Sequence, residues 1–123
     1  QKPSFINQTK LDGMFRIAKQ MLKDAIDSYI EGNEALAKSV IESDDTLDKL
    51  NVENHKILVD IMKQDKNNIE SGVVLLVMSR QLERLGDHCT NIAEDVFFIV
   101  EARLIKHKYE KYLFGDEKED VED

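Results

Sequence analysis

The chain of 123 residues contains 17 basic and 25 acidic residues, which gives a formal net charge of −8 at pH 7. This length suits one ordinary domain, and an acidic chain without a basic stripe argues against nucleic acid as a partner. Apolar residues make up 41% of the chain, while one proline and five glycines leave few breaks in a helical pattern. We therefore expect a single all-α domain.

The first amphipathic segment runs from about residue 8 to residue 31. Its apolar residues recur at spacings of three and four, which predicts one apolar face of a helix. These residues are Leu11, Met14, Phe15, Ala18, Met21, Leu22, Ala25, Ile26 and Tyr29. Gly32 then stands where a C-terminal helix glycine belongs, and Asn33 can cap the helix that follows.

Two more segments have the same helical period. The second, residues 34–63, carries the stripe Leu36, Val40, Leu47, Leu50, Ile57, Leu58 and Ile61. The third begins near Asn67, where Asn67 and Glu70 resemble a capping box, and runs to about residue 107. Its stripe is Val74, Met78, Leu82, Leu85, Cys89, Ile92, Ala93 and Val96. Because short connections force antiparallel neighbours, we expect an up-down-up three-helix bundle.

The two ends of the chain are expected to lie outside this bundle. We assign residues 1–7 to a linker, residues 8–110 to the bundle and residues 111–123 to a disordered acidic tail. The last nine residues hold six acids and one lysine, a net charge of −5, so the remainder carries only −8 − (−5) = −3. A chain that starts at Gln1 and not at Met suggests a piece of a longer protein.

The cellular setting is predicted from what the sequence lacks. Cys89 is the single cysteine, so no disulfide forms within the chain, which is compatible with a reducing cytoplasm. No signal peptide is visible, and no apolar run reaches the roughly 18 residues of a membrane span. We expect a cytoplasmic protein.

Oxygen-bearing side chains recur at helical spacing in the second and third segments. Residues four apart lie on the same helix face, where two carboxylates can share a hard cation. The candidate metal ligands are Asp44, Asp48, Glu83, Asp87, Asn91 and Glu94. The ordinary alternative is a solvated acidic face without a ligand, since acid pairs at this spacing are common on helix surfaces.

The helical period also indicates where these acids point. At about 100° per residue, the four oxygen-bearing residues of the third segment lie opposite its apolar stripe of Leu82, Leu85 and Cys89. These four are Glu83, Asp87, Asn91 and Glu94. Asp44 and Asp48 lie on the flank of the apolar stripe of the second segment. We therefore expect a metal on the outer surface, or in a groove between the second and third helices. A buried di-iron enzyme would need Glu-x-x-His pairs, and no histidine here has a glutamate three residues earlier.

The sequence around these acids resembles a known family. Residues 83–94, ERLGDHCTNIAE, closely resemble the signature E-R-[IL]-x-D-H-x-x-N-I-[AG]-E of the PhoU family of phosphate-uptake regulators. Residues 43–50, SDDTLDKL, are similar to the acidic segment of the same family, D-x-x-[IV]-D-x-L. The resemblance covers nearly the whole chain apart from the tail, although Ala102 stands where many members have glycine. Members usually contain two such three-helix repeats, and this chain resembles the second.

The resemblance implies a metal site and a regulatory role. Family members bind multinuclear metal clusters, iron in some, so Asp44, Asp48, Glu83 and Asp87 would be ligands, with Asn91 and Glu94 as outer groups. Members are negative regulators that link a phosphate ABC transporter ATPase to a sensor histidine kinase at the inner membrane, by contact and not by catalysis. A homo-oligomer is a further expectation. The alternatives are an accessory domain of a sodium–phosphate cotransporter, a carboxylate-bridged metalloenzyme, and a helical oligomerisation module without metal.

Overall fold

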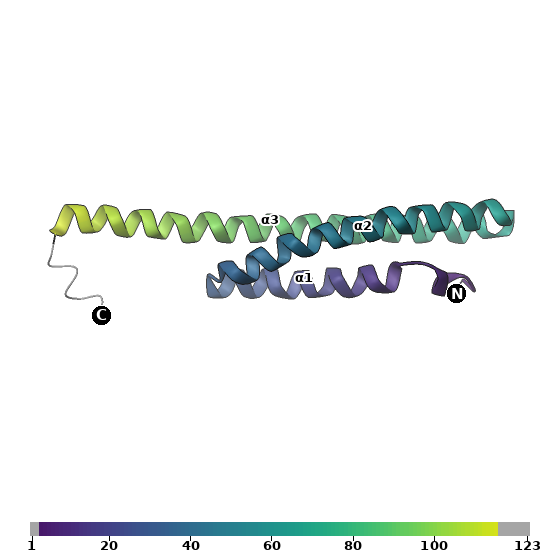
Figure 1. Cartoon of the computed structure of the whole chain (residues 1–123), viewed down its shortest axis with the longest axis horizontal. Coiled ribbons are helices and arrows are strands. Elements are labelled where there is room, and N and C mark those ends of the chain that lie inside the picture. The colour runs from purple at the N-terminus through teal and green to yellow at the C-terminus, as the bar shows by residue number, and fades with distance from the viewer. Residues whose placement is uncertain (1–2, 116–123) are drawn as a thin grey trace.

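Three long helices form the body of the computed structural model, which describes residues 3–115. In chain order the elements are η1 (Ile6–Gln8), α1 (Leu11–Glu31), α2 (Glu34–Gln64), η2 (Lys66–Asn68) and α3 (Ile69–Phe114). The helices run up, down and up, side by side, as predicted (Figure 1). None of the helices within residues 3–115 is both long enough and apolar enough to cross a bilayer.

The two connections differ in how well their sequences predict them. Gly32 has a left-handed backbone (φ 64°) and its N–H bonds back to the Ser28 carbonyl, and the Asn33 side chain accepts from the Leu36 N–H at 3.1 Å. Both caps were predicted. At the second connection the predicted capping box at Asn67 is wrong. Asp65 caps a 3₁₀ turn there by accepting from the Asn67 N–H at 2.9 Å, and this turn delays the start of α3 to Ile69.

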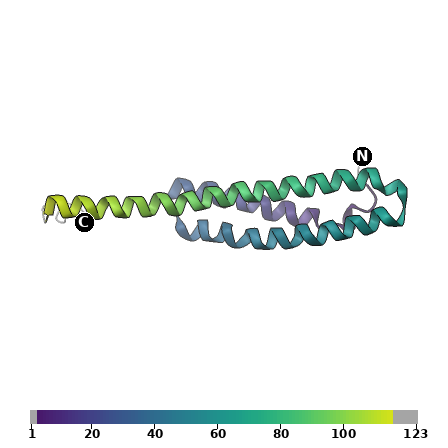
Figure 2. The same cartoon turned by 90° about the horizontal axis from the view of Figure 1, so that it is seen from above.

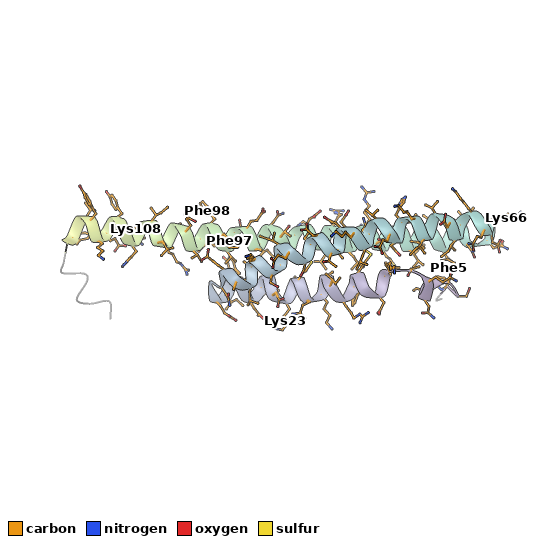
Figure 3. All side chains as sticks on the ribbon, viewed as in Figure 1. Phe5, Lys23, Lys66, Phe97, Phe98 and Lys108 are labelled. Atoms are coloured by element: carbon orange, nitrogen blue, oxygen red, sulfur yellow. The ribbon has the colours of Figure 1, made fainter. Side chains whose placement is uncertain are left out.

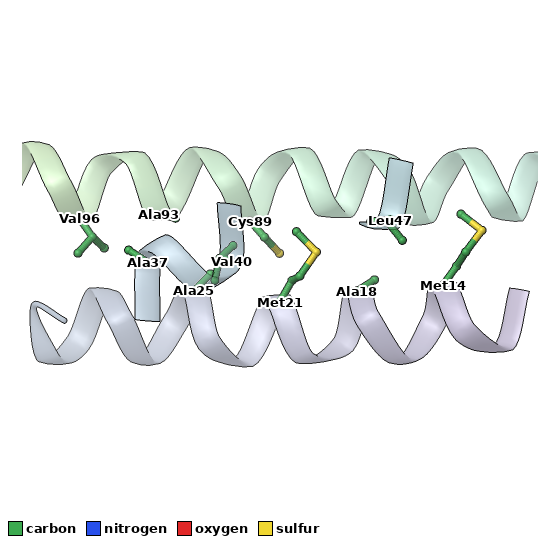
Figure 4. Packing of buried hydrophobic residues seen from close by; sticks show 10 residues of the cluster. All are labelled: Met14, Ala18, Met21, Ala25, Ala37, Val40, Leu47, Cys89, Ala93 and Val96. Carbon is green, nitrogen blue, oxygen red and sulfur yellow. The ribbon is translucent and has the colours of Figure 1, made fainter. Parts of the chain in front are cut away.

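The main core lies where all three helices run together (Figure 4). Its buried members are Met14, Ala18, Met21, Ala25, Ala37, Val40, Leu47, Cys89, Ala93 and Val96. The predicted stripes are only partly right, because Phe15, Val74 and Met78 are 56%, 54% and 48% exposed. The helices meet through small side chains, so the buried arc of each helix is narrower than its apolar stripe.

The segment before α1 belongs to the bundle, although we expected a linker over residues 1–7. Phe5 is buried in a second core cluster with Leu11, Leu58, Ile61 and Leu75. The Lys10 N–H also donates to Oδ1 of the buried Asn54 at 2.8 Å. This segment lies at the end of the bundle where α2 and α3 extend past α1 (Figure 2), so it covers apolar surface that α1 does not reach.

At the other end, α3 runs past the turn between α1 and α2 and continues alone to Phe114 (Figure 1). We expected the helix to end near residue 107 and the bundle near residue 110, so residues 111–114 of the expected tail are helical. Gly115, with a φ of 67°, ends the helix. The rest of the expected acidic tail, residues 116–123, lies outside the described residues. We call residues 98–114 of α3 the overhang.

Candidate metal centre

Asp44 approaches the backbone of α3 because residue 86 has no side chain. A Cβ at Gly86 would lie 2.6 Å from Leu47 Cδ2 and 3.1 Å from Asp44 Oδ1. Gly86 and Leu47 are both buried. The glycine therefore sets a close contact between α2 and α3, and this contact carries the aspartate into the interface.

The Asp44 carboxylate is in an unfavourable position for an unliganded acid. Its Oδ1 is buried and has no hydrogen-bond partner. Burial, followed by repulsion from Asp48, Asp87, Asp45 and Glu83, raises the pKa of Asp44 to about 6. Every charged group that contributes to the raised pKa of Asp44 is another carboxylate. Removing a carboxylate from water without a partner costs free energy, and such perturbed acids are enriched at functional sites.

Asp48 joins the same group of acids. Burial is the main cause that raises its pKa, and repulsion from Asp87 and Asp45 adds to it, while a hydrogen bond with Glu83 acts in the opposite direction. Four of the six predicted ligands are therefore close enough to interact across the line where α2 meets α3. We call Asp44, Asp48, Glu83 and Asp87 the acid group.

A chain of hydrogen bonds leads from the core to this group. The Asn51 Nδ2 donates to Glu83 Oε2 at 3.1 Å, and the Asn51 Oδ1 accepts from the hydroxyl of Ser79, which is itself buried. These bonds hold the Glu83 carboxylate toward α2. Neither Asn51 nor Ser79 was predicted as part of the site. Their spacing was an available signal, because Asn51 follows Asp48 by three residues and Ser79 precedes Glu83 by four, which places each beside an acid.

The predicted direction of Glu83 is wrong. We placed it opposite the buried stripe of α3, but Glu83 is half-buried and bonds to Asn51 of α2. The stripe was drawn from apolar residues alone. The buried face of α3 also includes Gly72, Ser79 and Gly86, which moves its centre toward the acids. The alternative that we gave, a metal in a groove between the second and third helices, stays a prediction.

Asn91 and Glu94 lie apart from the acid group. Both are exposed, and Glu94 is absent from the groups that shift the pKa of Asp44 and Asp48. Glu94 follows Glu83 by eleven residues, a rise of roughly 16 Å along the helix. A direct role beside Asp44 therefore fits these two residues less well than it fits Asp87.

The donor chemistry of the acid group fits a hard cation. All four side chains offer oxygen, which suits magnesium, calcium, manganese or iron, and the unpartnered Asp44 Oδ1 is an available ligand atom. As the side chains lie, however, no group of three or more His, Cys, Asp or Glu within residues 3–115 is arranged to hold an ion. A metal would therefore require side-chain rotation. A hollow of about 340 Å³ opens beside Glu83 and is lined in part by Asn51, His55, Ser79, Arg80 and Glu83, but not by the other three acids of the group.

Cys89 is close to this region but buried in the core. Burial raises the pKa of its thiol, and the charge of Asp44 raises it further. A thiol with a raised pKa holds its proton and reacts slowly, so Cys89 is a packing residue here, as the sequence predicted.

A three-helix bundle with paired carboxylates on two neighbouring helices defines a class of small helical module. The PhoU domain model matches residues 11–96, a range that contains all six predicted ligands. The chain therefore belongs to the PhoU family.

Relatives named phosphate-specific transport system accessory protein PhoU homolog support this assignment. The Xylella fastidiosa (strain Temecula1) protein is 34% identical over 98 residues, which cover 80% of this chain and 41% of the relative. The Aquifex aeolicus protein is 32% identical over 111 residues, which cover 90% of this chain and 50% of the relative. The chain thus spans half or less of the length of these relatives. No solved structure matches it.

Proposed function

We propose that this chain is a regulatory module of phosphate transport and phosphate-starvation signalling. The observation that carries the proposal is the PhoU domain over residues 11–96, together with relatives that are named as accessory proteins of phosphate-specific transport systems. Family resemblance favours a cytoplasmic negative regulator that contacts the ATPase of a phosphate ABC transporter and a sensor histidine kinase. Such a module acts by binding and not by turnover.

We further propose that the acid group binds metal, with iron favoured by family resemblance. The support is the Asp44 Oδ1 atom, buried without a partner among other carboxylates. A cation would supply the missing positive charge, and it would also lower the pKa of these acids because only the ionised form binds. Bound metal would join α2 to α3 and stiffen the surface that a partner contacts.

The metal proposal is tested on protein purified without chelator or a nickel column. Elemental mass spectrometry and an anaerobic Fe²⁺ titration are expected to show metal on the wild type. The variant in which Asp44, Asp48, Glu83 and Asp87 are replaced by Ala is expected to bind none. A matched control is Asp27→Ala with Glu31→Ala, which removes two carboxylates four residues apart on α1. Metal retained by the fourfold variant, or absent from the wild type, contradicts the site and leaves the family assignment unchanged.

The regulatory proposal needs a separate readout. In the source organism, loss of the protein is expected to raise expression of phosphate-transport genes in phosphate-rich medium, because a negative regulator has been removed. Restoring the wild-type protein should lower expression again. Restoring the fourfold Ala variant tests whether the metal site is needed for the regulation. Unchanged expression on loss of the protein contradicts the regulatory role and says nothing about metal binding.

A further inference from the structure

One face of the overhang carries apolar side chains that are exposed in the part of the chain that the structure describes. Phe97 is half-buried and packs on the main core, whereas its neighbour Phe98 is 74% exposed at the point where α3 leaves the bundle (Figure 3). Further along, Ile105 and Tyr109 are 61% and 62% exposed. With Phe98 and Ala102 they line a shallow hollow of about 420 Å³, which Glu101 and Lys106 border. We call Phe98, Ala102, Ile105 and Tyr109 the overhang stripe.

We propose that the overhang stripe is an interface with a second copy of this chain, in which two overhangs pack antiparallel as a short two-helix coiled coil. The spacings within the stripe are four, three and four, which is the 3.5-residue period of a coiled-coil seam. A solvent-facing helix has no need of that period. An exposed apolar patch of this kind marks an interaction site more often than chance.

Size and charge both favour the same chain as the occupant. In an antiparallel pair centred between residues 102 and 105, Phe98 lies opposite Tyr109 of the second copy, and Ala102 lies opposite Ile105. Each layer at the centre then pairs a small side chain with a larger one. Glu101 flanks the seam and meets Lys108 of the second copy, and the two-fold symmetry repeats this ion pair. The stripe is thus complementary to itself.

The surrounding structure leaves room for the second helix. The turn between α1 and α2 reaches α3 near Val100 and Arg103, since a Cβ at Gly32 would lie 4.0 and 3.6 Å from these side chains. At about 100° per residue, both positions are more than a quarter turn from the centre of the stripe. An antiparallel arrangement also puts the two bundles at opposite ends, where they cannot collide. Because the overhang is already helical, pairing does not bear the cost of nucleating a helix.

Light scattering over a range of chain concentrations tests the proposal, since it reports mass regardless of shape. We expect the mass to rise from the chain mass of 14.2 kDa toward twice that value as the concentration increases. The pairing should be weak, because the interface is smaller than the standard ~1,600 Å². Ile105→Glu should remain monomeric. The matched control is Leu104→Glu, at a position of nearly equal exposure (58%) about 100° away on the same helix, which should still dimerise.

Three outcomes overturn the proposal. These are a wild type that stays monomeric up to millimolar concentration, an Ile105→Glu variant that still dimerises, and a Leu104→Glu variant that loses the dimer equally. The first would leave the stripe to a different partner, such as another three-helix unit. Circular dichroism of both variants checks that the overhang stays helical.

Disulfide trapping tests the antiparallel direction. A mixture of Phe98→Cys and Tyr109→Cys chains should form the mixed disulfide in preference to either symmetric one. Cys89 does not compete, because its thiol is buried and its pKa is raised. A Tyr109→Cys variant that links efficiently to itself would indicate a parallel pair and would overturn the proposed packing.

Discussion

In two regions along α3, side chains lie in environments that do not suit their polarity. Where α3 meets α2, a carboxylate oxygen of Asp44 is buried without a partner, whereas in the overhang Phe98 is 74% exposed. Buried polar groups and exposed apolar patches are the informative departures from ordinary burial. The first region points to a charged ligand and the second to an apolar partner.

The difference between the regions comes from what lies beside the helix and not from the helix itself. Between residues 72 and 96, α3 presents Gly72, Ser79, Gly86 and Ala93 to its neighbours, and these small residues let two other helices come close. Beyond residue 103 no helix within the described residues lies beside α3, and between residues 98 and 103 only the end of α1 and the turn after it reach one side, so apolar residues elsewhere on this part of the helix stay exposed. Burial here is a property of the packing partner.

The largest expected effect separates a core leucine from an overhang leucine. Leu47 is 0% exposed and packs against Gly86, so Leu47→Ala should lower the free energy of unfolding by about 2–5 kcal/mol. Leu104 is 58% exposed, and Leu104→Ala should change the free energy of unfolding by less than about 0.5 kcal/mol. Urea titration followed by circular dichroism measures both. Equal losses would mean that the overhang is packed against something in solution.

The three helices and the first turn were predictable from the sequence because their signals are local. The spacing of Met14, Ala18, Met21 and Ala25 reveals one helix face, and the Gly32-Asn33 pair carries its own cap chemistry. The second turn was not predictable in the same way. Asp65 and Asn67 are both good capping residues, and the choice between them depends on the 3₁₀ turn that brings Asn68 into contact with the Ile61 carbonyl.

The identities of the acids were predictable from the sequence, but their environment was not. The four-residue spacing found Asp44, Asp48, Glu83 and Asp87, since it is a property of each helix alone. The burial of Asp44 depends on the distance between α2 and α3, which Gly86 sets from another part of the chain. The Asn51 to Glu83 bond likewise joins residues 32 positions apart. An apolar stripe cannot reveal a close contact that is made by a glycine.

A pair of glycine substitutions sharpens the comparison by testing that close contact. Gly86→Ala would put a Cβ 2.6 Å from the buried Leu47, so it should destabilise the protein by about 1–3 kcal/mol and displace Asp44. Gly72→Ala gains the same helix propensity, and its Cβ would lie 2.5 Å from Met62 Cγ and 2.7 Å from Met62 Sδ, so Met62 must also shift. Met62 is half-buried and unbranched, however, and can turn away more easily than the fully buried Leu47. We expect Gly72→Ala to stay within about 1 kcal/mol of the wild type. Similar effects of the two substitutions in thermal unfolding would show that the α2–α3 distance adjusts freely.

The smallest expected effect, and the one with an unusual sign, comes from Asp44 itself. Its folded pKa of about 6 lies above the ordinary value of 3.8, so the folded protein holds the Asp44 proton more tightly than the unfolded chain does. Stability contributed by this group is therefore present at low pH and is lost as pH rises from about 4 through 6. Without metal, Asp44→Asn should stabilise the protein at pH 7 by about 1–2 kcal/mol, after a discount because Asp44 is only half-buried.

The same substitution should flatten the rise in stability of the metal-free protein between pH 7 and pH 5. Part of that rise should remain, because the pKa of Asp48 is raised in the same direction. Glu42→Gln, at an exposed position on α2, is the control and should change stability by less than about 0.5 kcal/mol. If Asp44→Asn instead destabilises the metal-free protein, the carboxylate has a favourable partner and its burial no longer points to a cation. If Asp44→Asn stabilises the metal-free protein and also abolishes Fe²⁺ binding, then Asp44 lowers the stability of the metal-free fold. Its role as a metal ligand would then explain why an aspartate stands at this position.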